Sequence, residues 1–206
     1  MKKILIIAPH GDDGELGCGA TISRFIEEKN EVHHLAFTCI AKGGEGKKID
    51  TTKEVEDSMI NVLGIKPEHL FFSNMEIREF HKVRQVILDF MIKLNRINNY
   101  DMVFTPSLSD THQDHIVVAQ ESLRAFKKAT ILGYELPWNN FSFYSSCFVV
   151  VNKRHVGKKI DALSKYVTQL HRDYMNPNFI LSWANVRGVQ INRKYAEMFE
   201  VIRWII

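Results

Sequence analysis

The alternation of short apolar runs with amphipathic stretches is the feature that most constrains the fold of this chain. Runs typical of buried strands at about 3–8, 31–38, 69–72 and 101–105 are each followed by a stretch with helical periodicity. A strand, a helix and a further strand in this order place consecutive strands parallel in one sheet. The sequence therefore predicts an α/β fold, Rossmann-like, with a mostly parallel sheet and helices on both faces.

The remaining elements follow from the same patterns. The apolar end of the chain, 201–206, is expected to pack on the core or on a second copy of the chain, which favours a homo-oligomer. Later strands are expected at 131–136 and 146–151, and helices at about 16–29, 52–63, 79–97, 109–128, 158–171 and 193–199.

Length and charge limit the classes of protein to which the chain can belong. With 206 residues and no linker or repeat, we expect one domain spanning 1–206. The formal net charge is +3, and lysine and arginine form no marked cluster, so nucleic acid is not an expected partner.

Cysteine usage and hydropathy predict a cytoplasmic location. The three cysteines are odd in number and match no zinc-finger spacing, as expected for small buried residues in a reducing compartment. The apolar run after the first lysines is too short for a signal peptide, and no stretch approaches the roughly 18 apolar residues that a membrane span needs.

Two groups of imidazole and carboxylate side chains each follow a predicted strand. The first contains His10, Asp12 and Asp13, and the second contains His112, Asp114 and His115. Either group alone is more often a surface salt bridge or a helix cap. The carboxyl ends of parallel strands meet at one rim of a sheet, where ligands bind in open α/β folds. Together the two groups therefore indicate a site for Zn²⁺ or another first-row divalent ion.

A catalytic divalent site has a known minimum composition. It needs about three protein ligands, an open position for water, and a base that is not itself a ligand. The two groups supply more donors than this, and the residues alone leave open which of them bind the metal.

These residues resemble the PIG-L/LmbE-like family of metal-dependent N-acetylglucosaminyl deacetylases. The paired elements are His10-Gly11-Asp12-Asp13 and Asp110-Thr111-His112-Gln113-Asp114-His115. Gly44-Glu45-Gly46 is similar to the family's Gly-Glu loop, and the similarity covers nearly the whole chain. Gly11 departs from the usual proline, which predicts a looser loop around the first group.

The resemblance implies a role for each site residue. His10, Asp13 and His115 would bind the metal, expected to be Zn²⁺ with Fe²⁺ as an alternative. Asp12 would be the general base that deprotonates the metal-activated water. His112 would be protonated and would stabilise the oxyanion or protonate the amine, and Asp114 would hold His112 and raise its pKa.

The resemblance also implies the substrate. The chain would be a zinc-dependent hydrolase that removes the N-acetyl group from an amino sugar or sugar conjugate, releasing acetate and a free amine. Glu45 and Arg187 would contact that small-molecule substrate. The alternatives are a metal-dependent hydrolase of another amide or ester, and a sugar- or nucleotide-binding module without catalysis.

Overall fold

A computed structural model describes residues 1–42, 47–144 and 147–206. Its centre is a seven-stranded sheet in the order β5-β2-β1-β6-β7-β9-β8, in which β9 runs antiparallel to both of its neighbours. The strands are β1 (Lys3–His10), β2 (Glu31–Thr38), β5 (Leu70–Phe72), β6 (Met102–Pro106), β7 (Thr130–Tyr134), β8 (Cys147–Val151) and β9 (Tyr195–Arg203). A small hairpin of β3 (Ile40–Lys42) and β4 (Lys48–Asp50) lies outside this sheet. The predicted mostly parallel sheet is confirmed.

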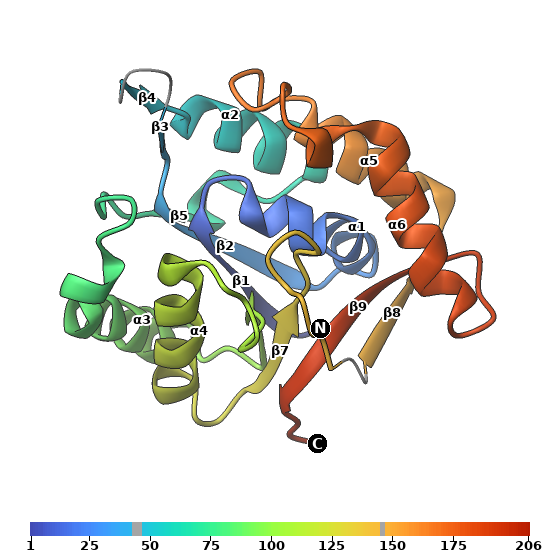
Figure 1. Cartoon of the computed structure of the whole chain (residues 1–206). Coiled ribbons are helices and arrows are strands. Elements are labelled where there is room, and N and C mark those ends of the chain that lie inside the picture. The colour runs from blue at the N-terminus through green and yellow to red at the C-terminus, as the bar shows by residue number, and fades with distance from the viewer. Residues whose placement is uncertain (43–46, 145–146) are drawn as a thin grey trace.

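Helices cover both faces of the sheet, as predicted (Figure 1). One face carries α1 (Asp13–Glu27), α2 (Thr52–Glu56) with its π-helical continuation Asp57–Leu63, α5 (Lys153–Leu163) and α6 (Pro177–Val189). The other face carries α3 (Arg84–Asn98) and α4 (Gln113–Ala125). Short 3-10 turns lie at Pro67–His69, Phe80–Lys82 and Asp173–Met175.

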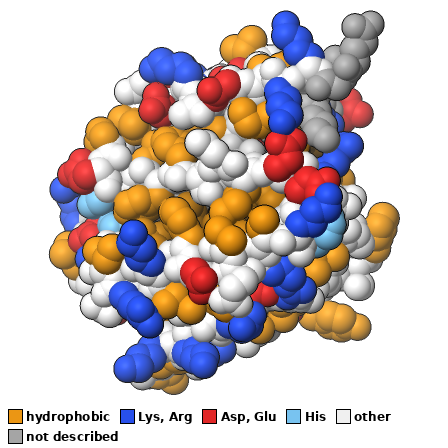
Figure 2. Space-filling view, turned by 90° about the vertical axis from the view of Figure 1, so that its left-hand side faces the viewer, with side chains coloured by type: hydrophobic (Ala, Val, Ile, Leu, Met, Phe, Trp, Pro, Cys, Tyr) orange, Lys and Arg blue, Asp and Glu red, His pale blue; other side chains and the backbone are white. Residues whose placement is uncertain are grey.

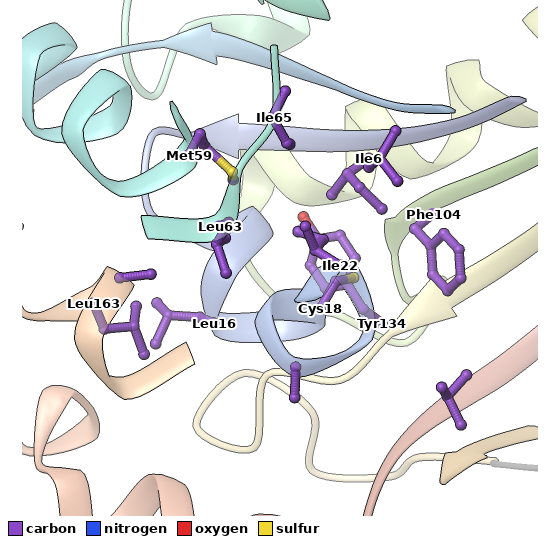
Figure 3. Packing of buried hydrophobic residues seen from close by; sticks show 14 of the residues in the cluster. Ile6, Leu16, Cys18, Ile22, Met59, Leu63, Ile65, Phe104, Tyr134 and Leu163 are labelled. Carbon is purple, nitrogen blue, oxygen red and sulfur yellow. The ribbon is translucent and has the colours of Figure 1, made fainter. Parts of the chain in front are cut away.

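The pleat of the central strand β1 divides the core into two clusters. Ile4 and Ile6 belong to the cluster beneath α1, whereas Leu5 and Ile7 belong to the cluster beneath α3 and α4. All four side chains are essentially inaccessible to solvent, as expected of a parallel strand covered on both faces. Figure 3 shows the first cluster, in which α1 contributes Leu16, Cys18 and Ile22 and the neighbouring helices contribute Met59, Leu63 and Leu163.

The sequence prediction was wrong in the last quarter of the chain. The segment 193–199, predicted as a helix, lies largely in β9, because its residues complete the sheet between β7 and β8. The helix α6 was not predicted, and α5 begins at Lys153 and ends at Leu163 rather than extending to 171. The side chain of Asn152 caps α5 by accepting a hydrogen bond from the backbone N–H of His155.

Part of the molecular surface is apolar. Hydrophobic side chains gather in the middle of the face seen in Figure 2, with charged side chains around them. Of the apolar end of the chain, Val201 and Ile202 pack against the two core clusters, whereas Trp204 and Ile206 are exposed. Among the helices of the described ranges, none combines the length and the apolar character that crossing a membrane requires.

Candidate active site

The first group of site residues is held by the junction of β1 and α1. His10 is the last residue of β1, and Asp13 is the first residue of α1. The backbone N–H of His10 donates to Oδ2 of Asp13 at 2.8 Å, which turns this carboxylate back over the end of the strand. The turn therefore presents an imidazole and a carboxylate to the same space.

The second group lies beside the first because β1 and β6 are neighbouring parallel strands. After β6, the Asp110 carboxylate accepts hydrogen bonds from the backbone N–H of His112 at 2.7 Å and from Nδ1 of His115 at 2.8 Å. No role was predicted for Asp110, although an acid a few residues before a candidate ligand histidine is a signal for one.

Three donor atoms converge where the two groups meet. Nδ1 of His10 lies 3.0 Å from Oδ2 of Asp13, and Nε2 of His115 lies 3.1 Å from the same oxygen. The two imidazole nitrogens are 3.1 Å apart. Tetrahedral Zn²⁺ with bonds of about 2.0–2.1 Å places its ligand atoms about 3.3 Å apart. The three donors therefore fit one divalent cation.

The opposite nitrogen of each imidazole is bound by a carboxylate. Nε2 of His10 donates to Asp114 Oδ2 at 3.2 Å, and Nδ1 of His115 donates to Asp110 Oδ2 at 2.8 Å. Such outer carboxylates select the tautomer whose free nitrogen faces a metal. This arrangement supports the ligand set His10, Asp13 and His115 independently of the distances.

The charges of the cluster also suit a cation. Burial lowers the pKa of both imidazoles, but the Asp13 charge and the carboxylate hydrogen bonds outweigh it and raise the pKa to about 8 for His10 and about 10 for His115. Burial opposes ionisation of Asp13, yet the two imidazoles hold its pKa well below the usual range. The same negative potential that retains protons here favours a bound metal ion.

The expected pairing of Asp114 with His112 differs from the observed one. The Asp114 carboxylate accepts hydrogen bonds from His10 and from the backbone N–H of Arg78 at 2.7 Å. Instead, the backbone N–H of Asp114 donates to Nδ1 of His112 at 3.2 Å. Asp114 therefore orients the imidazole of His10 rather than that of His112.

The expected charge of His112 differs as well. Burial, together with His115 and His10, lowers the pKa of His112 to about 4. Because Nδ1 of His112 accepts a backbone hydrogen bond, Nε2 carries the proton of the neutral ring. His112 is therefore a neutral N–H donor and not the protonated imidazolium that was expected.

These residues open into a cavity of about 310 Å³. Asp12 lines it beside the three donors, and burial followed by the charge of Asp13 raises the pKa of Asp12 to about 6. A carboxylate with this pKa suits proton transfer near neutral pH. The lining also includes His112, Arg78, Trp138, Tyr166, Arg172 and Tyr174.

Comparison with known proteins agrees with this geometry. The profile of the PIG-L family, described as GlcNAc-PI de-N-acetylase, matches residues 5–126, which contain both groups. The chain belongs to the PIG-L family. The family assignment made from the paired elements is thereby confirmed.

A sequence relative and two solved structures extend the comparison. The uncharacterised deacetylase YaiS of Escherichia coli K12 is 32% identical over 171 residues, which cover 80% of this chain and 90% of YaiS. The conserved protein TT1542 of Thermus thermophilus shares the fold with a TM-score of 0.83 and 22% identity, over 100% of this chain and 97% of that protein. The N,N'-diacetylchitobiose deacetylase of Pyrococcus horikoshii has a TM-score of 0.73 and 20% identity, over 98% of this chain and 84% of that protein.

Of the two residues of this PIG-L protein that were expected to contact the substrate, only Arg187 lies in the part of the chain that the structure describes. Glu45 lies outside the described residues. Arg187, on α6, is not part of the cavity lining, and its guanidinium forms a two-pronged ion pair with buried Glu135. Binding of substrate by either residue stays a prediction.

The loop with Gly11 in place of proline is closely packed. A Cβ atom at residue 11 would lie 2.7 Å from Cγ2 of Val55, so the space a side chain would need is already filled. The hydroxyl of Tyr166 lies 2.8 Å from the Gly11 carbonyl and 2.6 Å from Oε1 of buried Glu15, to which Ser58 also donates. These contacts stabilise the turn that holds His10 and Asp12. A looser loop was expected there because Gly11 replaces the usual proline.

Proposed function

We propose that this PIG-L protein is a zinc-dependent hydrolase that removes the N-acetyl group from an amino sugar or a sugar conjugate. The observation that carries the proposal is the triangle of donor atoms from His10, Asp13 and His115 beside Asp12. Fe²⁺ accepts the same ligands and is the alternative metal. The catalysed reaction is hydrolysis of the acetamide to acetate and a free amine.

The residues of the chain divide the chemistry among them. When bound, the cation supplies Lewis acidity toward the acetamide and the attacking water. Asp12, which lines the cavity and is not one of the three converging donors, accepts the proton of that water. The Nε2–H of His112 donates to the carbonyl oxygen as negative charge develops on it. Asp12 then returns the proton to the departing amine.

The outer carboxylates keep this arrangement in place. Asp114 and Asp110 fix the imidazoles of His10 and His115, so the donor atoms are ordered before the substrate binds. Positioning of this kind avoids reorganisation during the reaction.

A metal-loaded substrate panel tests the proposal. Purified protein stripped of metal and reloaded with Zn²⁺ or Fe²⁺ is assayed for release of acetate from N-acetylglucosamine, N,N'-diacetylchitobiose and simple acetate esters. We expect amide hydrolysis with one equivalent of metal, and its loss in His115→Ala. Activity confined to the esters would favour the second enzyme class, and tight sugar binding without hydrolysis would favour the non-catalytic module.

Two further expectations belong to the proposal. The cytoplasmic location stays a prediction from cysteine usage. The homo-oligomer stays a prediction from the apolar end of the chain, where Trp204 is 54% exposed.

A further inference from the structure

A second group of metal-donor side chains lies at the edge of the sheet opposite the candidate active site. It consists of Glu31, His33 and His69, whose donor atoms all lie within 4.8 Å of one another. Glu31 and His33 are at the amino end of β2, and His69 immediately precedes β5. Thr38, at the other end of β2, lines the active-site cavity. The length of this strand therefore separates the two groups, roughly 20 Å.

The register of the sheet places these three side chains on one face. β2 and β5 are neighbouring parallel strands (Figure 1), and the pairing of His34 with Leu70 puts the preceding residues, His33 and His69, next to each other. Residues two apart in a strand share a face, so Glu31 joins them. Nε2 of His33 lies 2.9 Å from Oε1 of Glu31. The rings of His33 and His69 stack with their centroids 4.1 Å apart.

The buried imidazole of His33 is oriented by a partner on its other side. Its Nδ1 lies 2.9 Å from the hydroxyl oxygen of Tyr100, which is also buried. A tyrosine hydroxyl accepts as well as donates, so it can take the hydrogen bond of an Nδ1–H and leave the lone pair of Nε2 for a metal. The same division holds at His115, whose outer nitrogen contacts Asp110. His33 therefore has the outer partner that a ligand histidine needs.

The third donor and the entry route are accessible. His69 is half-buried, and its ring nitrogens form no hydrogen bond with any residue that the structure describes. The ring can therefore turn toward the other two donors without breaking a hydrogen bond. Glu31 and His69 also line a cavity of about 410 Å³. A hydrated ion can approach the group through this cavity.

The lysines around the group oppose a cation only weakly. Nζ of Lys3 lies 3.1 Å from Oε1 of Glu31, but both side chains are partly exposed. Displacing such an ion pair reduces an affinity by about fivefold or less. Lys29 and Lys66 line the cavity and are exposed, so water and salt screen their charges. We therefore expect weaker metal binding here than at the active site.

We propose that Glu31, His33 and His69 form a second divalent-metal site, which takes Zn²⁺. Two imidazoles and one carboxylate are an established zinc ligand set and leave a fourth position for water. Rotation of the His69 ring brings the donors from their present spread to the separation of about 3.3 Å that tetrahedral Zn²⁺ requires. The site lies outside the proposed hydrolase chemistry and does not depend on it.

The bound ion links two segments that are far apart in the sequence. His69 is the last residue of the 3-10 turn Pro67–His69, and β5 after it is an edge strand of only three residues. A metal shared with β2 therefore holds this turn and β5 against the rest of the sheet. The role of the second site is to stabilise the edge of the sheet, since binding of a ligand to the folded state alone favours that state.

Zinc titration in competition with a chromophoric chelator tests the proposal on the full chain. We expect the wild type to bind two equivalents of Zn²⁺, one tightly and one weakly. His69→Ala should keep the tight equivalent and lose the weak one, whereas His115→Ala should lose the tight equivalent and keep the weak one. The matched control is His81→Ala, because His81 is exposed and belongs to neither group, and there both equivalents remain.

Two further measurements separate the site from a general effect on folding. Tyr100→Phe removes only the outer partner of His33, so the affinity of the weak equivalent should fall by about 10- to 100-fold while the tight one is unchanged. In His115→Ala, where only the second site binds, added Zn²⁺ should slow amide hydrogen exchange in β5. Adding His69→Ala to this variant should abolish the slowing.

Several results would overturn the inference. Binding of a single equivalent by the wild type would do so, as would a weak equivalent that persists in His69→Ala or disappears in His81→Ala. If His69→Ala failed to fold, the same titration of Glu31→Gln would decide, since loss of the weak equivalent is expected there as well. Exchange in β5 that does not respond to Zn²⁺ would reject the stabilising role given to the ion.

Discussion

Nε2 of His10 lies 3.2 Å from Oδ2 of Asp114, a side chain 104 positions further along the chain. The other nitrogen of His10, Nδ1, faces Asp13 at 3.0 Å. The imidazole is therefore held between two carboxylates from the first turns of two different helices, α1 and α4. One carboxylate belongs to the proposed metal site, and the other favours the tautomer in which Nδ1 would be free to bind the metal.

Asp114→Asn is expected to weaken metal binding while the fold remains. The amide oxygen still accepts from the backbone N–H of Arg78, but the charge that orients His10 is lost. Loss of such an outer carboxylate costs about 10- to 100-fold in metal affinity. Competition titration with a chromophoric chelator measures this, and Asp161→Asn on the exposed face of α5 serves as the control. An unchanged affinity would contradict the role given to Asp114.

Metal removal is expected to lower the melting temperature. A ligand present at about a thousand times its Kd stabilises the folded state by about 4 kcal/mol. For a chain of this size, each kcal/mol corresponds to about 2–4 °C, so Zn²⁺ should raise Tm by about 8–16 °C over chelator-treated protein. Scanning fluorimetry with and without Zn²⁺ checks this. In His115→Ala the metal-induced rise should largely vanish, and a full rise there would exclude His115 as a ligand.

Asp12→Asn is expected to retain the metal and lose turnover by about 10²- to 10⁴-fold, the usual contribution of a general base. The pKa of Asp12, raised to about 6, also predicts the pH profile. Because the base acts when deprotonated, kcat/KM should rise as pH increases through about 6 and then level off. Steady-state rates from pH 5 to 8, with metal content measured in parallel, give the profile. Turnover in Asp12→Asn equal to that of wild type would remove Asp12 as the base.

Glu15 is expected to make stability depend on pH. Burial raises the pKa of Glu15 from 4.5 to about 8, although the hydrogen bonds from Ser58 and Tyr166 lower it. Between these values the folded state keeps a proton that the unfolded state releases, so stability is highest below about pH 4.5 and declines toward pH 8 for this group. The decline is up to about 4 kcal/mol. Urea unfolding of Glu15→Gln across this range should show a flatter profile than wild type, whereas exposed Glu68→Gln should not.

Arg187→Ala is expected to destabilise the fold more than it affects catalysis. Glu135 is buried and accepts hydrogen bonds from Arg187 and from Nε1 of Trp183. Removing one partner of a buried pair leaves an uncompensated charge and costs about 3–5 kcal/mol. Chemical unfolding measures the loss, and kcat/KM well below the melting transition should remain within a few fold. A selective rise in KM without a loss of stability would instead favour the predicted substrate contact.

The fold could be predicted where each element has its own periodic signal. The segments 31–38 and about 79–97 are strongly periodic, the first as a strand and the second as a helix. The structure has β2 and α3 at these places. The prediction of a helix at 193–199 was wrong because the apolar residues of this segment fit one face of a helix as well as they fit a strand. Pairing with β7 and β8, which is non-local, decided in favour of the strand.

The residue types of the site could be predicted, but their pairing could not. The positions of His10, Asp13 and His115 after two strands already indicate one metal site, because parallel neighbours share a rim. The carboxylate that each imidazole contacts depends on ångström-scale differences in loop geometry. For this reason Asp114 was expected to bind His112, whereas it binds His10, and Asp110 received no role.

Periodicity, a local property of the chain, was sufficient to indicate the α/β architecture, and the paired elements indicated the donor groups and, by resemblance, the family. Folding in three dimensions set which carboxylate contacts each imidazole of the proposed metal site and the backbone hydrogen bond to Nδ1 of His112. The orientation of His10 depends on Asp114, 104 residues away, whereas the short-range contacts of His115 with Asp110 and of His112 with the backbone of Asp114 form only when the segment after β6 is folded and buried.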